Sequence, residues 1–150
     1  MKAIDYIRQK RAIITADDFA ISEGVDQTII KLMQVGKISR TSVLVTSSRA
    51  PSSVKQLLKI TKNGIGLHLD FTFGRALSIS GSSLLTDNNG NFNRGFGQIL
   101  LLSLLFPVKM RQLVANEIKA QTIALKKMGA NISHIDGHQH IHMIPLIFNC

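Results

Sequence analysis

The sequence predicts an α/β fold built on parallel strands. Two observations support this class: short β-prone apolar runs alternate with amphipathic helical segments, and polar residues gather where the apolar runs end. With 150 residues and 45% hydrophobic content, the chain is long enough to bury a core. We expect one domain over residues 1–150, with its core starting at about residue 12, and right-handed crossovers between neighbouring strands.

The first half of the chain predicts three strands separated by two helices. The predicted strands are Ala12–Ala16, Thr41–Thr46 and Ile65–Asp70. Ser22 is a suitable N-cap for the first helix, which we expect to end at Gly36. The second helix is expected to begin at Pro51 and to end at Asn63 and Gly64.

The second half predicts a long loop, a broken helix and a fourth strand. The loop is expected from Phe71 to Gly97, because this segment is rich in Gly, Ser and Asn. Helical periodicity returns at about Gln98, is interrupted at Pro107 and continues to Gly129. The fourth strand, 131–136, leads into a segment rich in histidine.

Composition limits the classes of partner. The 18 basic and 9 acidic residues give a net charge of +9, which would suit a nucleic-acid partner. However, the basic residues are scattered, and with one Tyr and no Trp the chain has few aromatic rings on which bases could stack. We therefore expect no nucleic-acid partner. The single cysteine, Cys150, excludes a disulfide framework and a cysteine-based zinc site. The N-terminal segment has no apolar signal region and no apolar run is long enough to span a membrane, so we expect a cytoplasmic protein without a membrane partner.

Three clusters of chemically active side chains follow predicted strands. Asp17 and Asp18 follow the first strand, and His68 lies in the third. The third cluster surrounds the fourth strand and consists of His134, Asp136, His138, His140 and His142. Each cluster alone has a structural explanation, such as helix capping or a buried histidine. Together, at the same end of parallel strands, they favour a metal or water-activating hydrolytic site.

The alternating histidines leave two arrangements open. An extended segment would place His138, His140 and His142 on one side, whereas a turn at Gly137 would send them to different places.

These clusters stand in motifs that resemble the YdjC-like carbohydrate deacetylases, which are related to the wider polysaccharide deacetylases. The motifs are Thr15–Phe19 (TADDF), Gly66–Leu69 (GLHL), Glu117-x-x-x-Gln121, and His134–His142 followed by Pro145. The resemblance runs from about residue 12 to the end of the chain. It implies a parallel (β/α)-barrel-like fold, here incomplete with about four βα units. It also implies an enzyme that removes acetyl groups from N-acetylated sugars or oligosaccharides with the help of a divalent metal. Magnesium is the expected metal, and zinc or another divalent ion is the alternative.

Carried over by position, the resemblance implies a role for each cluster. Asp18, His68 and His138 would be the metal ligands, and Asp17 would be the base that deprotonates water. Three residues would orient a ligand or line the sugar groove without binding the metal: Asp136, His140 and His142.

Two motif positions need separate comment. Glu117 and Gln121 lie one helical turn apart, and we expect them to form structural hydrogen bonds. Ala20 stands where the family usually has Gly, and its Cβ is tolerable unless the position needs a positive φ.

The length of the chain leaves the activity open. An eight-fold barrel takes roughly 200–250 residues, and family members continue with further strands and a His-Pro motif that supplies an acid. The leading hypothesis is therefore that the chain is the N-terminal part of a deacetylase. Such a part could be an inactive fragment, could form a homo-oligomer, or could pair with a missing C-terminal half. A non-catalytic metal- or sugar-binding remnant is the alternative, and a basic nucleic-acid-binding protein is the weakest hypothesis.

Overall fold

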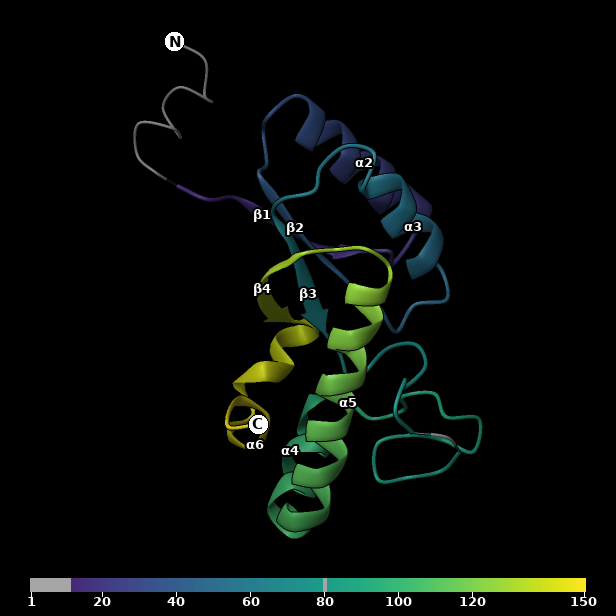
Figure 1. The fold of residues 1–150 in the computed structure, drawn as a ribbon. Coiled ribbons are helices and arrows are strands. Elements are labelled where there is room, and N and C mark those ends of the chain that lie inside the picture. The colour runs from purple at the N-terminus through teal and green to yellow at the C-terminus, as the bar shows by residue number, and fades with distance from the viewer. Residues whose placement is uncertain (1–11, 80) are drawn as a thin grey trace.

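The computed structural model describes residues 12–79 and 81–150, and its centre is a parallel sheet with helices packed around it (Figure 1). The strands are β1 (Thr15–Phe19), β2 (Arg40–Val43), β3 (Ile65–Leu69) and β4 (Ile132–Gly137). They lie in the order β1-β2-β3-β4, and each neighbouring pair is parallel. The predicted α/β class is confirmed, and the sequential strand order is that of the βα units in a barrel.

The helices begin close to the positions that the sequence predicts. They are α2 (Glu23–Gln34), α3 (Ala50–Leu57), α4 (Phe96–Leu105), α5 (Pro107–Lys127), the 3₁₀ helix η1 (His138–Met143) and α6 (Pro145–Phe148). The Ser22 hydroxyl caps α2 by accepting a hydrogen bond from the Val25 amide at 3.3 Å. Pro51 lies in the first turn of α3, and the break between α4 and α5 falls immediately before Pro107. These starts confirm the predicted capping and proline positions.

Several ends differ from the prediction. The first strand was expected at 12–16, but β1 pairs with β2 only from Thr15 onward, and Ile13 before it is 58% exposed. Asp17 and Asp18 therefore lie within the strand rather than after it. The second and third strands end at Val43 and Leu69, earlier than expected. Helix α3 ends at 57 instead of 63–64, because the chain continues through tight turns before β3 begins.

The core fills the space between the sheet and the helices. It includes the fully buried Phe19, Val43, Ile65, Leu67, Val54 and Val114. Strand β3 is buried along its whole length. Polar side chains carried by the two central strands, such as Ser42 and His68, are therefore buried as well and must find hydrogen-bond partners inside the protein.

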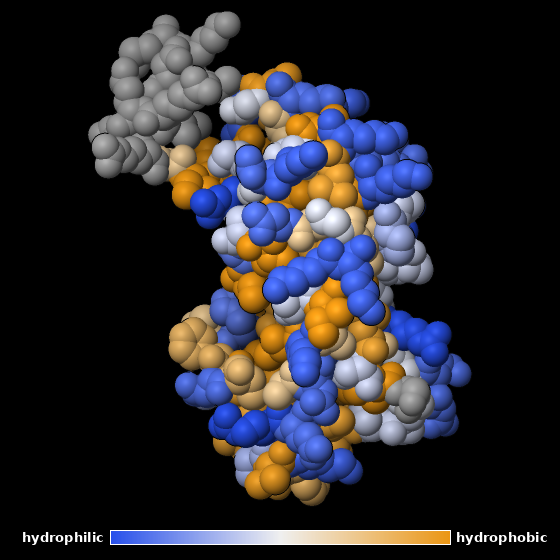
Figure 2. Space-filling model, in the orientation of Figure 1, coloured by the Kyte–Doolittle hydropathy of each residue, from blue (hydrophilic) through white to orange (hydrophobic). Residues whose placement is uncertain are grey.

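The surface matches the scattered charge of the sequence. Figure 2 shows hydrophilic residues spread over the whole of one face and interrupted by apolar ones. Among the described residues, no helix has the length and apolar character needed to cross a membrane.

Two glycines give a test of backbone conformation. Gly64 has φ +75°, and a Cβ there would lie 2.6 Å from the Ser39 carbonyl oxygen, so Gly64→Ala is expected to lower the free energy of unfolding by about 2 kcal/mol. Gly24 lies in α2, and a Cβ added at Gly24 would have nothing within 4 Å. Gly24→Ala is therefore expected to raise the free energy of unfolding by about 0.5 kcal/mol. Urea unfolding of both variants tests this, and equal effects would contradict it.

Candidate metal centre

Three side chains, two on strands and one directly after a third strand, meet at the carboxyl end of the sheet. Asp18 lies in β1, His68 in β3, and His138 directly follows β4. One ligand atom of each lies within 4.8 Å of the others. Asp18 Oδ1 is 3.1 Å from His68 Nε2 and 2.8 Å from His138 Nδ1. The structure thus brings together the three residues that the resemblance implies as metal ligands, in a group that could hold a metal ion.

The backbone of β1 explains how Asp18 reaches this point. Neighbouring residues of a regular strand point to opposite faces, yet Asp17 and Asp18 both lie within 4.8 Å groupings that contain His68. The register of β1 against β2 shifts between Ala16 and Phe19, and Asp18 has φ +64°. This irregularity, of the kind that re-aims side chains beside functional sites, turns both carboxylates toward the same histidine.

Ala20 occupies a position that does adopt a positive φ, of +79°. Its amide donates to Asp26 Oδ1 at 2.6 Å, and its carbonyl accepts from the Ser47 hydroxyl at 2.7 Å. The Cβ that replaces the usual hydrogen is therefore held in the left-handed region by bonds on both sides. These bonds fix the turn that follows Asp18.

Asp26 is a buried carboxylate that sequence analysis missed. It is 2% exposed and also accepts from the Ser53 hydroxyl at 2.6 Å and pairs with Arg49 at 3.4 Å. It joins α2, α3 and the turn after β1. A signal was present in the sequence, because Asp26 lies three residues before Ile29 and therefore on the apolar face of α2.

His68 is held between two carboxylates. Its Nδ1 lies 2.7 Å from Asp136 Oδ1, and its Nε2 faces Asp18. With the Nδ1 proton donated to Asp136, the Nε2 lone pair points toward the group formed by Asp18 and His138. A carboxylate that fixes the tautomer of a histidine in this way is typical of metal-binding histidines.

The pKa values of this pair shift in opposite directions. Burial lowers the pKa of His68, but the hydrogen bond and charge of Asp136, with the charges of Asp18 and Asp17, outweigh burial and raise it above its ordinary value. Burial raises the pKa of Asp136, but the hydrogen bond and charge of His68 outweigh it and lower this pKa. Both shifts favour an ionised pair in the protein without metal.

Asp17 lies beside the centre rather than within the group of three. It is exposed, and its Oδ1 accepts a hydrogen bond from Ser42 at 3.3 Å. Ser42 is also 3.1 Å from His68 Nδ1, and Asp17, His68 and Asp136 form a second group of close ligand atoms. Ser42 was not predicted as a site residue, although a hydroxyl in a buried strand is a signal for such a role.

The remaining histidines lie outside the group of three, and the ring centroids of His140 and His142 lie 6.2 Å apart. Gln139 and His140 have φ of +50° and +56°, so the chain turns immediately after Gly137, and the second of the two arrangements left open by the sequence is the one observed. His140 is exposed, and the ring of His142 packs over Gly137. Neither belongs to either group of ligand atoms. His134 packs over Gly66, with its Nε2 3.9 Å from Asp136.

Asp70 shapes the turn after β3. This fully buried carboxylate accepts from the Thr46 hydroxyl at 2.8 Å, the Thr72 amide at 2.8 Å and the Phe73 amide at 3.1 Å. Burial raises the pKa of Asp70, although these donors and the nearby His138 act in the opposite direction. The turn therefore presents Phe73 beside the centre, with its ring centroid 6.3 Å from that of His138.

Glu117 and Gln121 tie α5 to the same region. Gln121 donates to the Asp70 carbonyl at 2.6 Å and accepts from the Asp70 amide at 3.1 Å. The Glu117 carboxylate accepts from the amides of Leu77 and Ser78. Both side chains are fully buried, and the expected structural hydrogen bonding is confirmed.

The chain is similar to proteins of one known family. The sequence profile of the family described as "YdjC-like protein" matches residues 11–150. A "Carbohydrate deacetylase" of Vibrio cholerae O395 is 33% identical over 137 residues, which cover 90% of this chain and 51% of the relative. "Carbohydrate deacetylase 1" of Listeria innocua is 35% identical over 138 residues, 92% of this chain and 54% of the relative. The chain thus spans about half the length of these relatives.

A solved structure shows the same fold. It comes from Enterococcus faecalis V583 and is described as a "putative cellobiose-phosphate cleavage protein". It superposes with a TM-score of 0.71 at 28% identity, over 91% of this chain and 52% of that one.

The paired shifts of His68 and Asp136 predict a pH dependence of stability without metal. A raised histidine pKa contributes stability that is complete below about pH 6.5 and is lost as pH rises through the raised value. The destabilisation caused by Asp136→Asn is therefore expected to shrink between about pH 6 and pH 9. Urea unfolding at each pH, with a chelator present to remove metal, measures this destabilisation. Glu23→Gln on the exposed surface of α2 is the control. A pH-independent difference would contradict the ionised pair.

Asp70 gives a second test. Asp70→Ala leaves the Thr72 and Phe73 amides without a partner and is expected to lower the free energy of unfolding by about 3 kcal/mol. Asp70→Asn is expected to lower it by less than about 1 kcal/mol, because the amide oxygen can still accept from both amides while the Thr46 hydroxyl rotates to accept. Thermal and urea unfolding compare the two, and equal losses would show that the charge itself is required.

Proposed function

Because the chain belongs to the YdjC-like family, we propose that it provides the metal-binding part of a carbohydrate deacetylase, a hydrolase that removes acetyl groups from N-acetylated sugars. The observation that supports this most is the convergence of Asp18, His68 and His138 with the exposed carboxylate of Asp17 beside them. The names of the relatives support an acetylated carbohydrate as substrate.

The donor set fits a divalent cation. Asp18, His68 and His138 would hold it with one oxygen and two nitrogen atoms, and Asp136 fixes the tautomer that leaves His68 Nε2 available. The family resemblance favours magnesium, whereas two imidazoles also suit zinc or another transition ion. When bound, the cation supplies Lewis-acid chemistry, which polarises the amide carbonyl and lowers the pKa of water.

The residues of the chain supply the proton transfer and the positioning. Asp17 is exposed and carries an oxygen held by Ser42, so it is placed to accept the proton of the attacking water. Asp136 orients His68 and is not assigned a proton transfer. We assign no described residue to protonation of the leaving amine. Acetate release from N-acetylglucosamine oligomers in the presence of metal tests the activity. Metal binding without acetate release would favour the non-catalytic alternative.

The ligand assignment predicts a difference between two histidines. His68→Ala is expected to abolish binding of magnesium, manganese or zinc, because Nε2 is one of three donor atoms. His142→Ala is expected to keep most of the affinity, because this ring packs on Gly137 outside the centre. Isothermal titration calorimetry with each metal measures both. Equal losses would show that the ligands are wrongly assigned.

The role of Asp17 predicts a separation of binding from turnover. Asp17→Asn is expected to keep metal affinity but to reduce acetate release by about 10²–10⁴-fold, because an amide cannot accept the proton of water. The same substitution at the aligned aspartate of the Vibrio cholerae relative is the parallel measurement. Undiminished release in that relative would move the base to another residue.

A further inference from the structure

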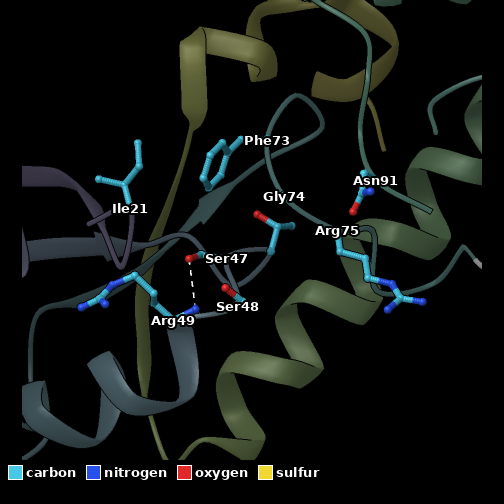
Figure 3. A pocket seen from close by; sticks show the side chains of 9 residues that line it. Ile21, Ser47, Ser48, Arg49, Phe73, Gly74, Arg75 and Asn91 are labelled. Atoms are coloured by element: carbon cyan, nitrogen blue, oxygen red, sulfur yellow. Dashed lines mark hydrogen bonds between the residues drawn. The ribbon is translucent and has the colours of Figure 1, made fainter. Parts of the chain in front are cut away.

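A cavity of about 370 Å³ is lined in part by Phe73, whose ring centroid lies 6.3 Å from that of His138 in the metal centre (Figure 3). Its walls include Ile21, Ser47, Ser48, Phe73, Gly74 and Asn91. The volume is within the range of cavities that bind small molecules.

Two walls of the cavity are anchored to the metal centre. The amide of Ile21 donates to the backbone carbonyl of Asp18 at 3.1 Å, so this wall follows directly from a proposed ligand. Phe73 forms another part of the lining, and its ring contacts the ring of His138. The cavity therefore borders the residues that hold Asp18 and His138 in place, although neither ligand lines it.

Phe73 is exposed and yet its backbone is fixed. Phe73 is 38% exposed, whereas Phe71, two residues earlier, is fully buried. On one side, the Asp70 carboxylate accepts the Phe73 amide proton. On the other, Gly74 has φ +72°, and a Cβ there would collide with the Thr46 carbonyl, so the chain is held close to Thr46. A rigid, exposed aromatic face beside a cavity is suited to contact with a ligand.

The charge around the cavity favours a neutral ligand. Figure 3 shows the guanidinium groups of Arg49 and Arg75 extending away from the centre of the cavity toward opposite sides, and Arg49 pairs with Asp26. The remaining polar side chains of the lining are those of Thr46, Ser47, Ser48 and Asn91. The hydroxyls of Thr46 and Ser47 already donate to Asp70 and to the Ala20 carbonyl. An apolar ring face with a few hydroxyl and amide groups matches a pyranose, which has an apolar C–H face and a polar rim.

We propose that Phe73 is the platform on which the sugar ring of the substrate stacks, with the ring in this cavity and its acetamido group directed toward the metal centre. The ring is a neutral pyranose. This inference rests on the proposed function and adds to it the residue that would hold the sugar ring of the substrate. Phe73 is a binding residue, and its removal should affect the sugar rather than the metal.

The absence of tryptophan from the sequence allows a direct optical test. Phe73→Trp introduces a single indole at the platform. Phe96→Trp is the matched control, because Phe96 is 37% exposed and lies at the start of α4, away from the cavity lining. Titration with N,N′-diacetylchitobiose in the presence of metal is expected to shift the emission of Phe73→Trp saturably and to leave the control unchanged. Sugar binding by calorimetry without an emission change at position 73 would overturn the proposal.

Affinity measurements separate the platform from the metal centre. Phe73→Ala is expected to weaken disaccharide binding about tenfold, because it removes the apolar face that the sugar ring covers. The affinity of Phe73→Leu for the disaccharide should lie between those of the unsubstituted chain and Phe73→Ala. Metal affinity should stay within about twofold in both. Unchanged sugar affinity in Phe73→Ala would overturn the platform and leave the proposed function intact. Absence of sugar binding in the unsubstituted chain, with metal bound, would overturn both the platform and the proposed substrate class.

Discussion

His68 is buried with a carboxylate within hydrogen-bond distance of each ring nitrogen, Asp136 at Nδ1 and Asp18 at Nε2. A charged or polar group in such a place needs partners on every side. The partners come from the two strands at the edges of the sheet, β1 and β4, so their registers against the central strands matter for the chemistry. Parallel pairing that sets His68 directly opposite Asp136 satisfies one side of this requirement. The bulge in β1 that turns Asp18 inward satisfies the other.

The order of elements and the identity of the ligands could be predicted because both depend on local pattern. Apolar runs of β-prone residues, the Ser22 cap and the prolines at 51 and 107 each act over a few residues. Parallel topology then places the carboxyl ends of the strands together, so Asp18, His68 and His138 meet although 120 residues separate the first from the last. The family motifs added the roles of these residues to their positions.

Other parts of the site depend on contacts between distant segments and could not be predicted. The bulge at Asp18 appears only when β1 pairs with β2, and the strand therefore starts and ends later than its apolar run. Ser42 becomes a site residue because the register of the sheet places it beside His68. In the sequence, Asp70 is an ordinary polar residue at the end of an apolar run. Its five accepted hydrogen bonds come from the turn after β3 and from Thr46 in the turn after β2.

The strained backbone of this chain is concentrated where the side chains of the centre must converge. Among the described residues, the non-glycine residues with positive φ are Asp18, Ala20, Gln139 and His140, and each is a proposed ligand or lies within two residues of one. For an alanine this conformation costs of order 1–2 kcal/mol, and it persists because the buried carboxylate of Asp26 and the hydroxyl of Ser47 bond to its amide and carbonyl. Asp26 thus acts on the centre without touching it: its bonds to α3 and to the turn fix the backbone that follows Asp18. Two of the buried carboxylates outside the centre, Asp26 and Asp70, have equivalent tasks. Each holds by hydrogen bonds the loop that follows a strand, one behind Asp18 and the other beneath Phe73.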